Sequence, residues 1–158
     1  MPRYAANTEV SSTKSRDEIE RTLTRYGADS FMYGWQDGSA VIAFRANDRR
    51  VRFILPLPDR QAREFTHHSK GVRDESAQAR LYEQAVRQRW RALALVIKAK
   101  LEAVEAGISE FEDEFLAHVM LPGGQTVGEW MRPQVAEAYL TRQMPPMLPM
   151  LPAPEKVQ

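Results

Sequence analysis

Arginines gather at two places in this 158-residue chain, and arginine is well suited to holding phosphate. Its planar guanidinium pairs with two phosphate oxygens at once, and binding releases counterions from a polyanion. One group surrounds a predicted turn and the other lies in a long helical pattern. The seven candidate phosphate contacts are Arg45, Arg49, Arg50, Arg52, Arg87, Arg89 and Arg91.

Aromatic residues accompany the first arginine group. Phe31, Tyr33 and Trp35 alternate with other residues at strand spacing, so they share one face of a strand. Aromatics beside basic residues on an open sheet stack nucleobases, for which Tyr33 and Trp35 are the candidates. The other interpretation is that these rings form the core face of a half-buried strand, where each stabilises the fold by roughly 1.5–3 kcal/mol. The sequence leaves both interpretations open.

Charge is unevenly distributed along the chain, although the net charge is only +1. Residues 66–104 hold eight basic and four acidic residues, whereas residues 105–158 hold three basic and eight acidic residues. One interpretation is a basic phosphate-binding helix surface. The other is that the acidic segment folds back on the basic helix, or meets it in a neighbouring subunit, because charge runs are often paired.

Catalytic and metal-binding patterns are missing. The chain has no cysteine, which excludes disulfides, cysteine-ligated zinc and thiol nucleophiles. The adjacent His67 and His68 cannot both face one metal, and His118 fits a partly buried residue better than a ligand. The acidic run at 110–114 lacks the spacing of a calcium loop. Phosphate-loop, dinucleotide, nucleophile-elbow and zincin motifs do not occur. We therefore expect no enzyme activity, no cofactor and no metal.

The composition is that of an ordinary globular domain, with 43% hydrophobic and 27% charged residues. No apolar run approaches the roughly 20 residues that a membrane span needs, and the first ten residues lack the apolar stretch of a signal peptide. We expect a cytoplasmic protein with no membrane partner.

The N-terminal half predicts a helix followed by a three-stranded meander. The helix begins near Ser12 or Ser15 and ends at Gly27, a residue able to adopt positive φ. The strands cover 31–36, 40–45 and 49–55, joined by Asp37-Gly38 and Asn47-Asp48 turns. Pro56 and Pro58 end the sheet because proline cannot donate ladder hydrogen bonds. Residues 59–73 are expected to form a polar connection.

The C-terminal half predicts a long helix from about Asp74 to Ala106, with one apolar seam at near-heptad spacing. A helical turn within 108–115, a short strand at 116–121 and a helix over 127–141 follow. Thr126 and Glu129 form a predicted capping box, and Pro133 predicts a kink or break. We expect a single α+β domain in which the long helix covers one face of the meander.

The predicted organisation is an N-terminal arm over 1–12, the domain over 13–141 and an extended proline-rich tail over 142–158. Pre-extended chain loses little entropy on docking, so the tail suits a groove on a partner or on a sister subunit. The alternative is a disordered tail. The candidate partner-binding residues, which would join subunits into a homo-oligomer, are Met147, Leu148, Met150 and Leu151.

Four segments resemble a group of small uncharacterised bacteriophage and prophage proteins. These segments are RTLTRYGADSFMYGWQ, RRVRFILPLPDR, QAVRQRWRALALVIKAKLEAVEAG and LPGGQTVGEWMRPQ. The resemblance spans roughly 13–152 and implies a phage context in a host cytoplasm, with no residue roles. The order helix, three strands, long helix is also similar to the β-β-β-α core of phage single-strand annealing proteins and to the double-stranded-RNA-binding domain. The chain lacks the basic helix start of the latter. Topology alone does not fix function.

We therefore predict a non-catalytic protein that binds single-stranded DNA or another nucleic acid and acts in replication or recombination by annealing strands as a homo-oligomer. The alternative is a protein-binding inhibitor of a host defence system, in which the acidic segment after Glu105 mimics nucleic acid. A phage structural or assembly protein is a third class.

Overall fold

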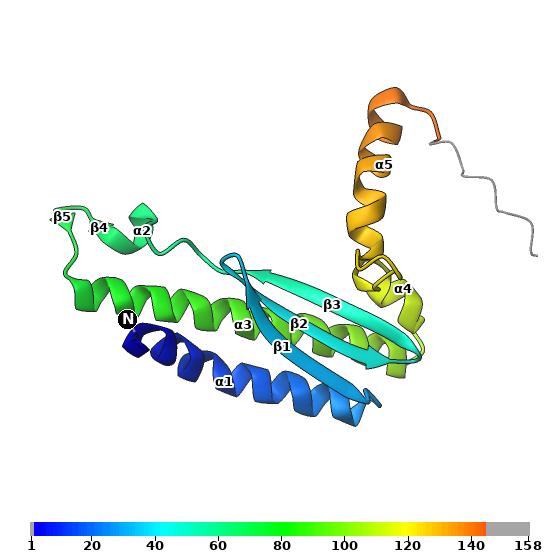
Figure 1. The fold of residues 1–158 in the computed structure, drawn as a ribbon, viewed down its shortest axis with the longest axis horizontal. Coiled ribbons are helices and arrows are strands. Elements are labelled where there is room, and N and C mark those ends of the chain that lie inside the picture. Colours follow the sequence, from blue (N-terminus) through cyan, green and yellow to red (C-terminus); the bar gives the residue numbers. More distant parts are fainter. Residues whose placement is uncertain (1, 145–158) are drawn as a thin grey trace, which may run out of the picture.

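The computed structural model describes the backbone of residues 2–144 and the side chains of residues 12–144. The chain is an α+β fold, as predicted (Figure 1). Its elements in order are α1 (Pro2–Arg25), β1 (Ser30–Gln36), β2 (Ser39–Ala46), β3 (Arg49–Pro56), α2 (Arg63–Thr66), β4 (His67–His68), β5 (Gly71–Val72), α3 (Glu75–Glu105), α4 (Phe111–Phe115), the 3₁₀ turn η1 (Leu116–His118) and α5 (Val127–Thr141).

The meander has the predicted strands and turns. β1, β2 and β3 pair antiparallel in sequence order, with Tyr33 opposite Ile42 and Ile42 opposite Phe53. Asp37 and Gly38 have φ of 46° and 73°, and the residues of the second turn, Asn47 and Asp48, also have positive φ. Two consecutive residues of positive φ match the right-handed twist of the flanking strands.

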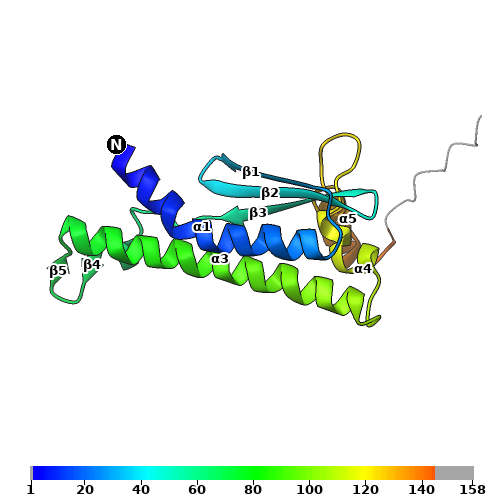
Figure 2. The ribbon, with the colours of Figure 1, turned by 90° about the horizontal axis from the view of Figure 1, so that it is seen from below.

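One face of the sheet, here called the inner face, carries the core. Its residues are Phe31, Tyr33, Ala40, Ile42, Phe44, Val51, Phe53 and Leu55. Figure 2 shows α1 and α3 on this side of the sheet, running in the same direction, while the loop before α5 rises on the other side. The two helices contribute Ile19, Leu23, Trp90 and Ile97 to the same apolar cluster. The core therefore lies between a helical layer and one face of the sheet.

The boundaries of α3 confirm the prediction, and those of α1 correct it. Asp74 caps α3 by accepting a hydrogen bond from the Ala77 amide at 2.7 Å. The predicted apolar seam of α3 is buried from Tyr82 to Leu101. The predicted helix start near Ser12 or Ser15 is wrong, because α1 begins at Pro2 and so includes most of the expected arm. Its polar composition concealed a helix whose apolar spacing begins only at Ile19.

The predicted strand at 116–121 is also wrong. Phe111, Phe115 and Val119 are buried at four-residue spacing, which is a helical period, and residues 111–118 form α4 and η1. Only isolated bridges remain of the strand, joining Val119 to Val51 and Met120 to Thr126.

α5 has the predicted bounds and the predicted capping box. The Glu129 amide donates to Thr126 Oγ1 at 3.2 Å, and Glu129 Oε2 accepts from the Thr126 amide at 2.8 Å. The helix passes through Pro133 without a break. The segment expected to be a polar connection, 59–73, contains α2 and the small hairpin β4–β5. Among residues 2–144, no helix is both long and apolar enough to span a bilayer.

Candidate nucleic-acid interface

The first arginine group lies mostly on the open face of the sheet, here called the outer face. The strand register sets Ser30, Arg45 and Arg50 in one row, Met32, Ala43 and Arg52 in the next, and Gly34, Val41 and Ile54 in the third. Arg45 and Arg50 are directly opposed across β2 and β3, an arrangement of like charges that destabilises a sheet unless an anion neutralises it.

Arg45 has such an anion within the chain. Its Nε donates to Asp29 Oδ1 at 2.8 Å, and its Nη2 donates to Asp29 Oδ2 at 2.6 Å. This two-point pair lowers the pKa of Asp29 below its ordinary value, chiefly through the hydrogen bonds from Arg45. Arg45 is therefore already engaged, although half of its side chain remains exposed.

Arg49 and Arg52 pair with the acidic C-terminal segment. Arg49 Nε donates to Glu112 Oε1 at 2.6 Å. Arg52 Nη2 donates to both carboxylate oxygens of Glu129, at 2.9 and 2.8 Å, and its Nη1 donates to the Gly124 carbonyl at 3.0 Å. These two pairs join the acidic segment to β3, whereas the sequence interpretation had it fold back on the basic helix. Among the described ion pairs, Lys100–Glu114 is the one that joins the acidic segment to α3. Within the described residues, Arg50 alone of this group has no ion pair.

The aromatic residues of β1 lie on the inner face, not beside the outer-face arginines. Tyr33 packs with its ring centroid 5.5 Å from that of Trp90, and the Arg16 guanidinium lies 4.2 Å from the Tyr33 ring centroid. Tyr33 is thus part of the packed interior, as the core interpretation expected. Trp35, at the rim, is 49% exposed and touches Tyr33 edge-on at 5.4 Å.

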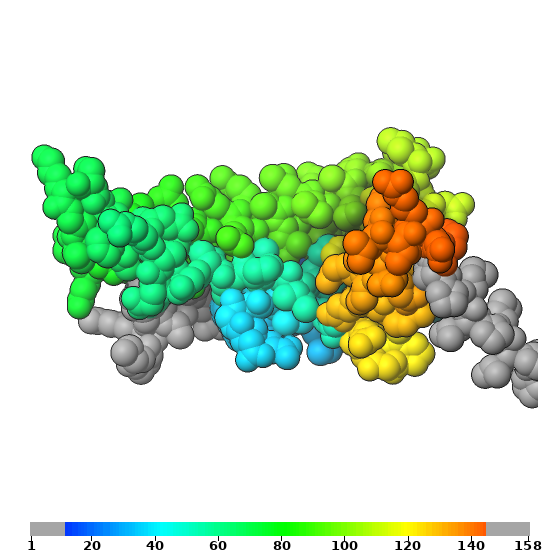
Figure 3. Space-filling view, turned by 90° about the horizontal axis from the view of Figure 1, so that it is seen from above, coloured from blue at the N-terminus to red at the C-terminus, as the bar shows by residue number. Residues whose placement is uncertain are grey.

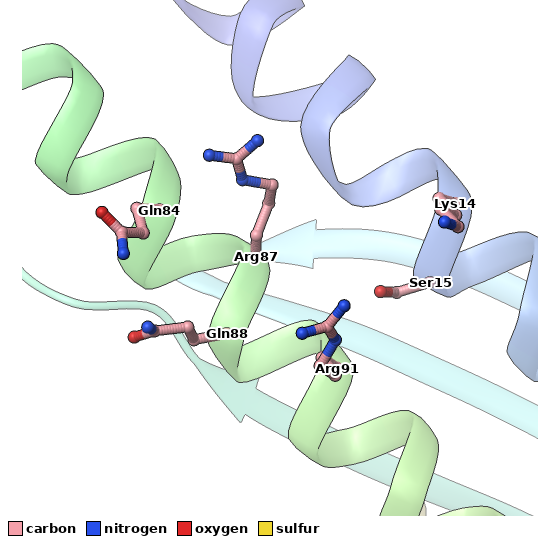
Figure 4. A pocket seen from close by; sticks show the side chains of 6 residues that line it. All are labelled: Lys14, Ser15, Gln84, Arg87, Gln88 and Arg91. Atoms are coloured by element: carbon pink, nitrogen blue, oxygen red, sulfur yellow. The ribbon is translucent and has the colours of Figure 1, made fainter.

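The arginines of α3 point in two directions. Arg89 Nη1 donates to the Pro56 carbonyl at 2.8 Å, at the end of β3. Arg87 and Arg91, one helical turn apart, are exposed and extend towards α1 (Figure 4). Arg87 and Arg91 therefore share a surface, and Arg89 lies apart from it.

A groove between α1 and α3 is built around these two arginines. Its volume is about 350 Å³, and Figure 4 shows the side chains that line it from the two helices. They are Lys14 and Ser15 of α1 with Gln84, Arg87, Gln88 and Arg91 of α3. No carboxylate is among them. Within the described part of the chain, Lys14, Arg87 and Arg91 make no ion pair.

The predicted site residues therefore do not form one surface. Arg45, Arg50 and Arg52 lie on the outer face of the sheet, whereas Arg87 and Arg91 line a groove in the helical layer. The sequence interpretation missed Lys14, Ser15 and the two glutamines. The repeated four-residue spacing of Gln84 with Gln88 and of Arg87 with Arg91 was the available signal, because it places all four on one side of α3. The candidate tail residues, Met147, Leu148, Met150 and Leu151, lie outside the described residues.

The histidines and acidic residues form structural contacts. His118 stacks on Phe53 with ring centroids 4.0 Å apart, and burial, followed by the charge of Lys100, lowers its pKa. Lys100 Nζ donates to the Glu114 carbonyl at 2.8 Å. Across the described residues, no three histidine, aspartate or glutamate side chains are placed to hold a metal ion.

Comparisons with family models, curated proteins and solved structures find no match for this chain.

Proposed function

We propose that the protein is a non-catalytic nucleic-acid-binding protein that holds the backbone of a single strand in the groove between α1 and α3. The observation that carries this proposal is the convergence of Lys14, Arg87 and Arg91 on one groove, with no carboxylate among the described residues that line it. Strand annealing during phage replication or recombination is the finer activity that we propose for it.

The chemistry of the groove suits a phosphodiester. Arg87 and Arg91 offer planar guanidinium donors and lie about 6 Å apart along the helix axis, so they can contact neighbouring phosphates. The Gln84 and Gln88 amides and the Ser15 hydroxyl add neutral donors for sugar or phosphate oxygens. A groove of about 350 Å³ has room for part of a single strand.

The arginines of the sheet contribute less to this proposal than the sequence led us to expect. Arg45, Arg49 and Arg52 each have a carboxylate partner within the chain. Displacing such a partner costs part of the energy that a phosphate contact would supply. Tyr33 is packed against Trp90, so half-exposed Trp35 is the better candidate for stacking a base.

The alternative function as a mimic of nucleic acid has less support. A mimic presents free carboxylates, whereas Glu112 and Glu129 are paired with arginines and Glu114 lies 3.4 Å from Lys100. The described part of the acidic segment is therefore partly neutralised by the chain itself.

Fluorescence anisotropy with a labelled single-stranded oligodeoxynucleotide tests the proposal. The groove variant is Lys14→Gln/Arg87→Gln/Arg91→Gln. The matched control, Arg63→Gln/Lys70→Gln/Arg132→Gln, removes the same charge from exposed residues that make no ion pair within the described chain. We expect the groove variant to bind roughly tenfold or more weakly, because hydrogen bonds to charged groups contribute about 1.5–3 kcal/mol each, and the control to bind nearly as wild type. Equal binding by both variants would contradict the groove site.

A further inference from the structure

α5 stands away from the rest of the molecule. Within the described residues, only its beginning is attached, where Gly128 lies against Ala117 and Glu129 pairs with Arg52. None of its fifteen residues is buried. Figure 1 shows the helix (orange) projecting beyond the β3 side of the sheet, with its far end clear of other described elements, and Figure 3 views it from that far end. Isolated helices of this length are marginal in water, so α5 needs a packing partner.

One side of α5 carries a stripe that suits such packing. Trp130, Pro133, Glu137 and Leu140 recur at spacings of three, four and three residues and so share one side of the helix. Trp130 is 45% exposed and Leu140 83% exposed. The stripe is thus apolar with a single carboxylate, Glu137, near its centre.

The outer face of the sheet is the complementary surface. An antiparallel sheet tolerates one solvated face, but that face is normally polar. Here Met32 is 69% exposed and Ile54 48% exposed. A hollow of about 560 Å³ on this face is lined by apolar Met32, Val41, Ala43 and Met120 together with Arg45, Arg50 and Arg52. Arg50, which lines this hollow, has no ion pair among the described residues.

α5 does not cover the outer face of its own chain. The Arg52–Glu129 pair and the capping box set the direction in which the helix leaves the edge of the sheet. A Cβ at Gly128 would lie 2.8 Å from the Ala117 carbonyl oxygen, so the helix start is fitted closely to η1. Turning α5 back onto its own sheet would require these contacts to break.

We infer that the protein self-associates through reciprocal exchange of α5: the stripe of each copy packs on the outer face of the other. Glu137 then meets Arg50, while the opposed Arg45 keeps its own partner, Asp29. Each chain contributes one helix and one outer face. A two-fold symmetric dimer therefore covers both helices and both faces, and it leaves no such surface open for a third copy. Burial of Trp130 from both copies would supply part of the ~1,200 Å² of a specific interface.

Cysteine cross-linking tests this arrangement directly, since the chain has no cysteine of its own. Leu140→Cys protein and Met32→Cys protein, carrying different tags, are mixed and oxidised. We expect a disulfide that joins the two tags. Tyr139→Cys is the matched control, because Tyr139 is equally exposed but lies on another side of α5, and it should cross-link to Met32→Cys far less. Cross-linking of Leu140→Cys mainly to itself, or equally from both positions, would overturn the exchange.

Light scattering without nucleic acid supplies a second readout. Wild type should have the mass of a dimer, Glu137→Arg and Arg50→Glu should each shift it towards a monomer, and the double variant should restore the dimer. A wild type that stays monomeric at tens of micromolar, or a charge swap that does not restore association, would contradict the inference. Neither readout involves the α1–α3 groove, so failure here leaves the nucleic-acid proposal standing.

Discussion

Arg52 on β3 and Glu129 on α5 are 77 residues apart in sequence and form a two-point ion pair, with Arg52 Nη2 donating to both carboxylate oxygens. The same carboxylate accepts from the Thr126 amide and so completes the capping box. The Glu129 side chain thus caps the N-terminus of α5 and also joins this helix to β3.

The first prediction concerns Glu129 and acid. The hydrogen bond from the Thr126 amide, helped by Arg52, lowers the pKa of Glu129 below its ordinary value of 4.5. The unfolded chain therefore takes up this proton first as the pH falls, so the stabilisation present above about pH 4.5 is lost below it. Urea unfolding between about pH 6 and 3 should show a smaller decline for Glu129→Gln than for wild type. Parallel declines would contradict this role.

The second prediction concerns the close approach of α5 to η1. Gly128→Ala places a Cβ 2.8 Å from the Ala117 carbonyl oxygen, which is backbone and cannot easily move. We expect a loss of roughly 1–3 kcal/mol in unfolding free energy. Gly34→Ala is the control, because a Cβ there meets no atom within 4 Å. Denaturant titration should show the loss only at Gly128; equal effects would mean that α5 is not fitted to η1.

The third prediction concerns Trp90 at the centre of the core. It is fully buried, and its indole nitrogen has no hydrogen-bond partner in the described structure. Trp90→Ala should cost about 3–5 kcal/mol of unfolding free energy. Trp90→Phe should cost much less, because it keeps most of the ring and removes a polar group that makes no hydrogen bond. Chemical denaturation of both variants measures the difference, and similar losses would refute this account of the indole nitrogen.

The fourth prediction concerns His118, which stacks on Phe53. Burial lowers its pKa below the ordinary value of 6.5, so the folded state favours the neutral ring. Stability contributed by the neutral ring is complete above about pH 6.5 and is lost as the pH falls through this value towards the lowered pKa. His118→Phe keeps an aromatic ring there and should flatten the stability profile between about pH 7 and 5. An unchanged profile would assign the pH dependence to other groups.

Much of the fold is predictable from local sequence. The Asp37-Gly38 turn, the Asp74 cap and the Thr126 capping box each depend on residues within a few positions of one another. The failures have local causes as well. The helical spacing of Phe111, Phe115 and Val119 was missed because it crosses into the mostly apolar run at 116–121, and the polar start of α1 gave no apolar period.

The candidate site is less predictable because it depends on long-range packing. Arg49 meets Glu112 across 63 residues, and no local pattern distinguishes this arginine from Arg50, which has no ion pair in the described chain. The groove likewise exists only because α1 lies beside α3, which brings Lys14 to Arg87. The sequence therefore predicted arginines as candidate phosphate contacts, but the tertiary packing determines which of them have no carboxylate partner in the described chain.

The salt dependence of single-strand binding tests the central claim most directly. For single strands, each phosphate contact contributes roughly 0.7 to the slope of the logarithm of the association constant against the logarithm of salt concentration. Removing Lys14, Arg87 and Arg91 together should therefore reduce the steepness of that slope by about 2, whereas the matched surface control should leave it nearly unchanged. A groove variant with the wild-type slope, or a wild-type protein that shows no salt-dependent binding at micromolar concentration, would contradict the account.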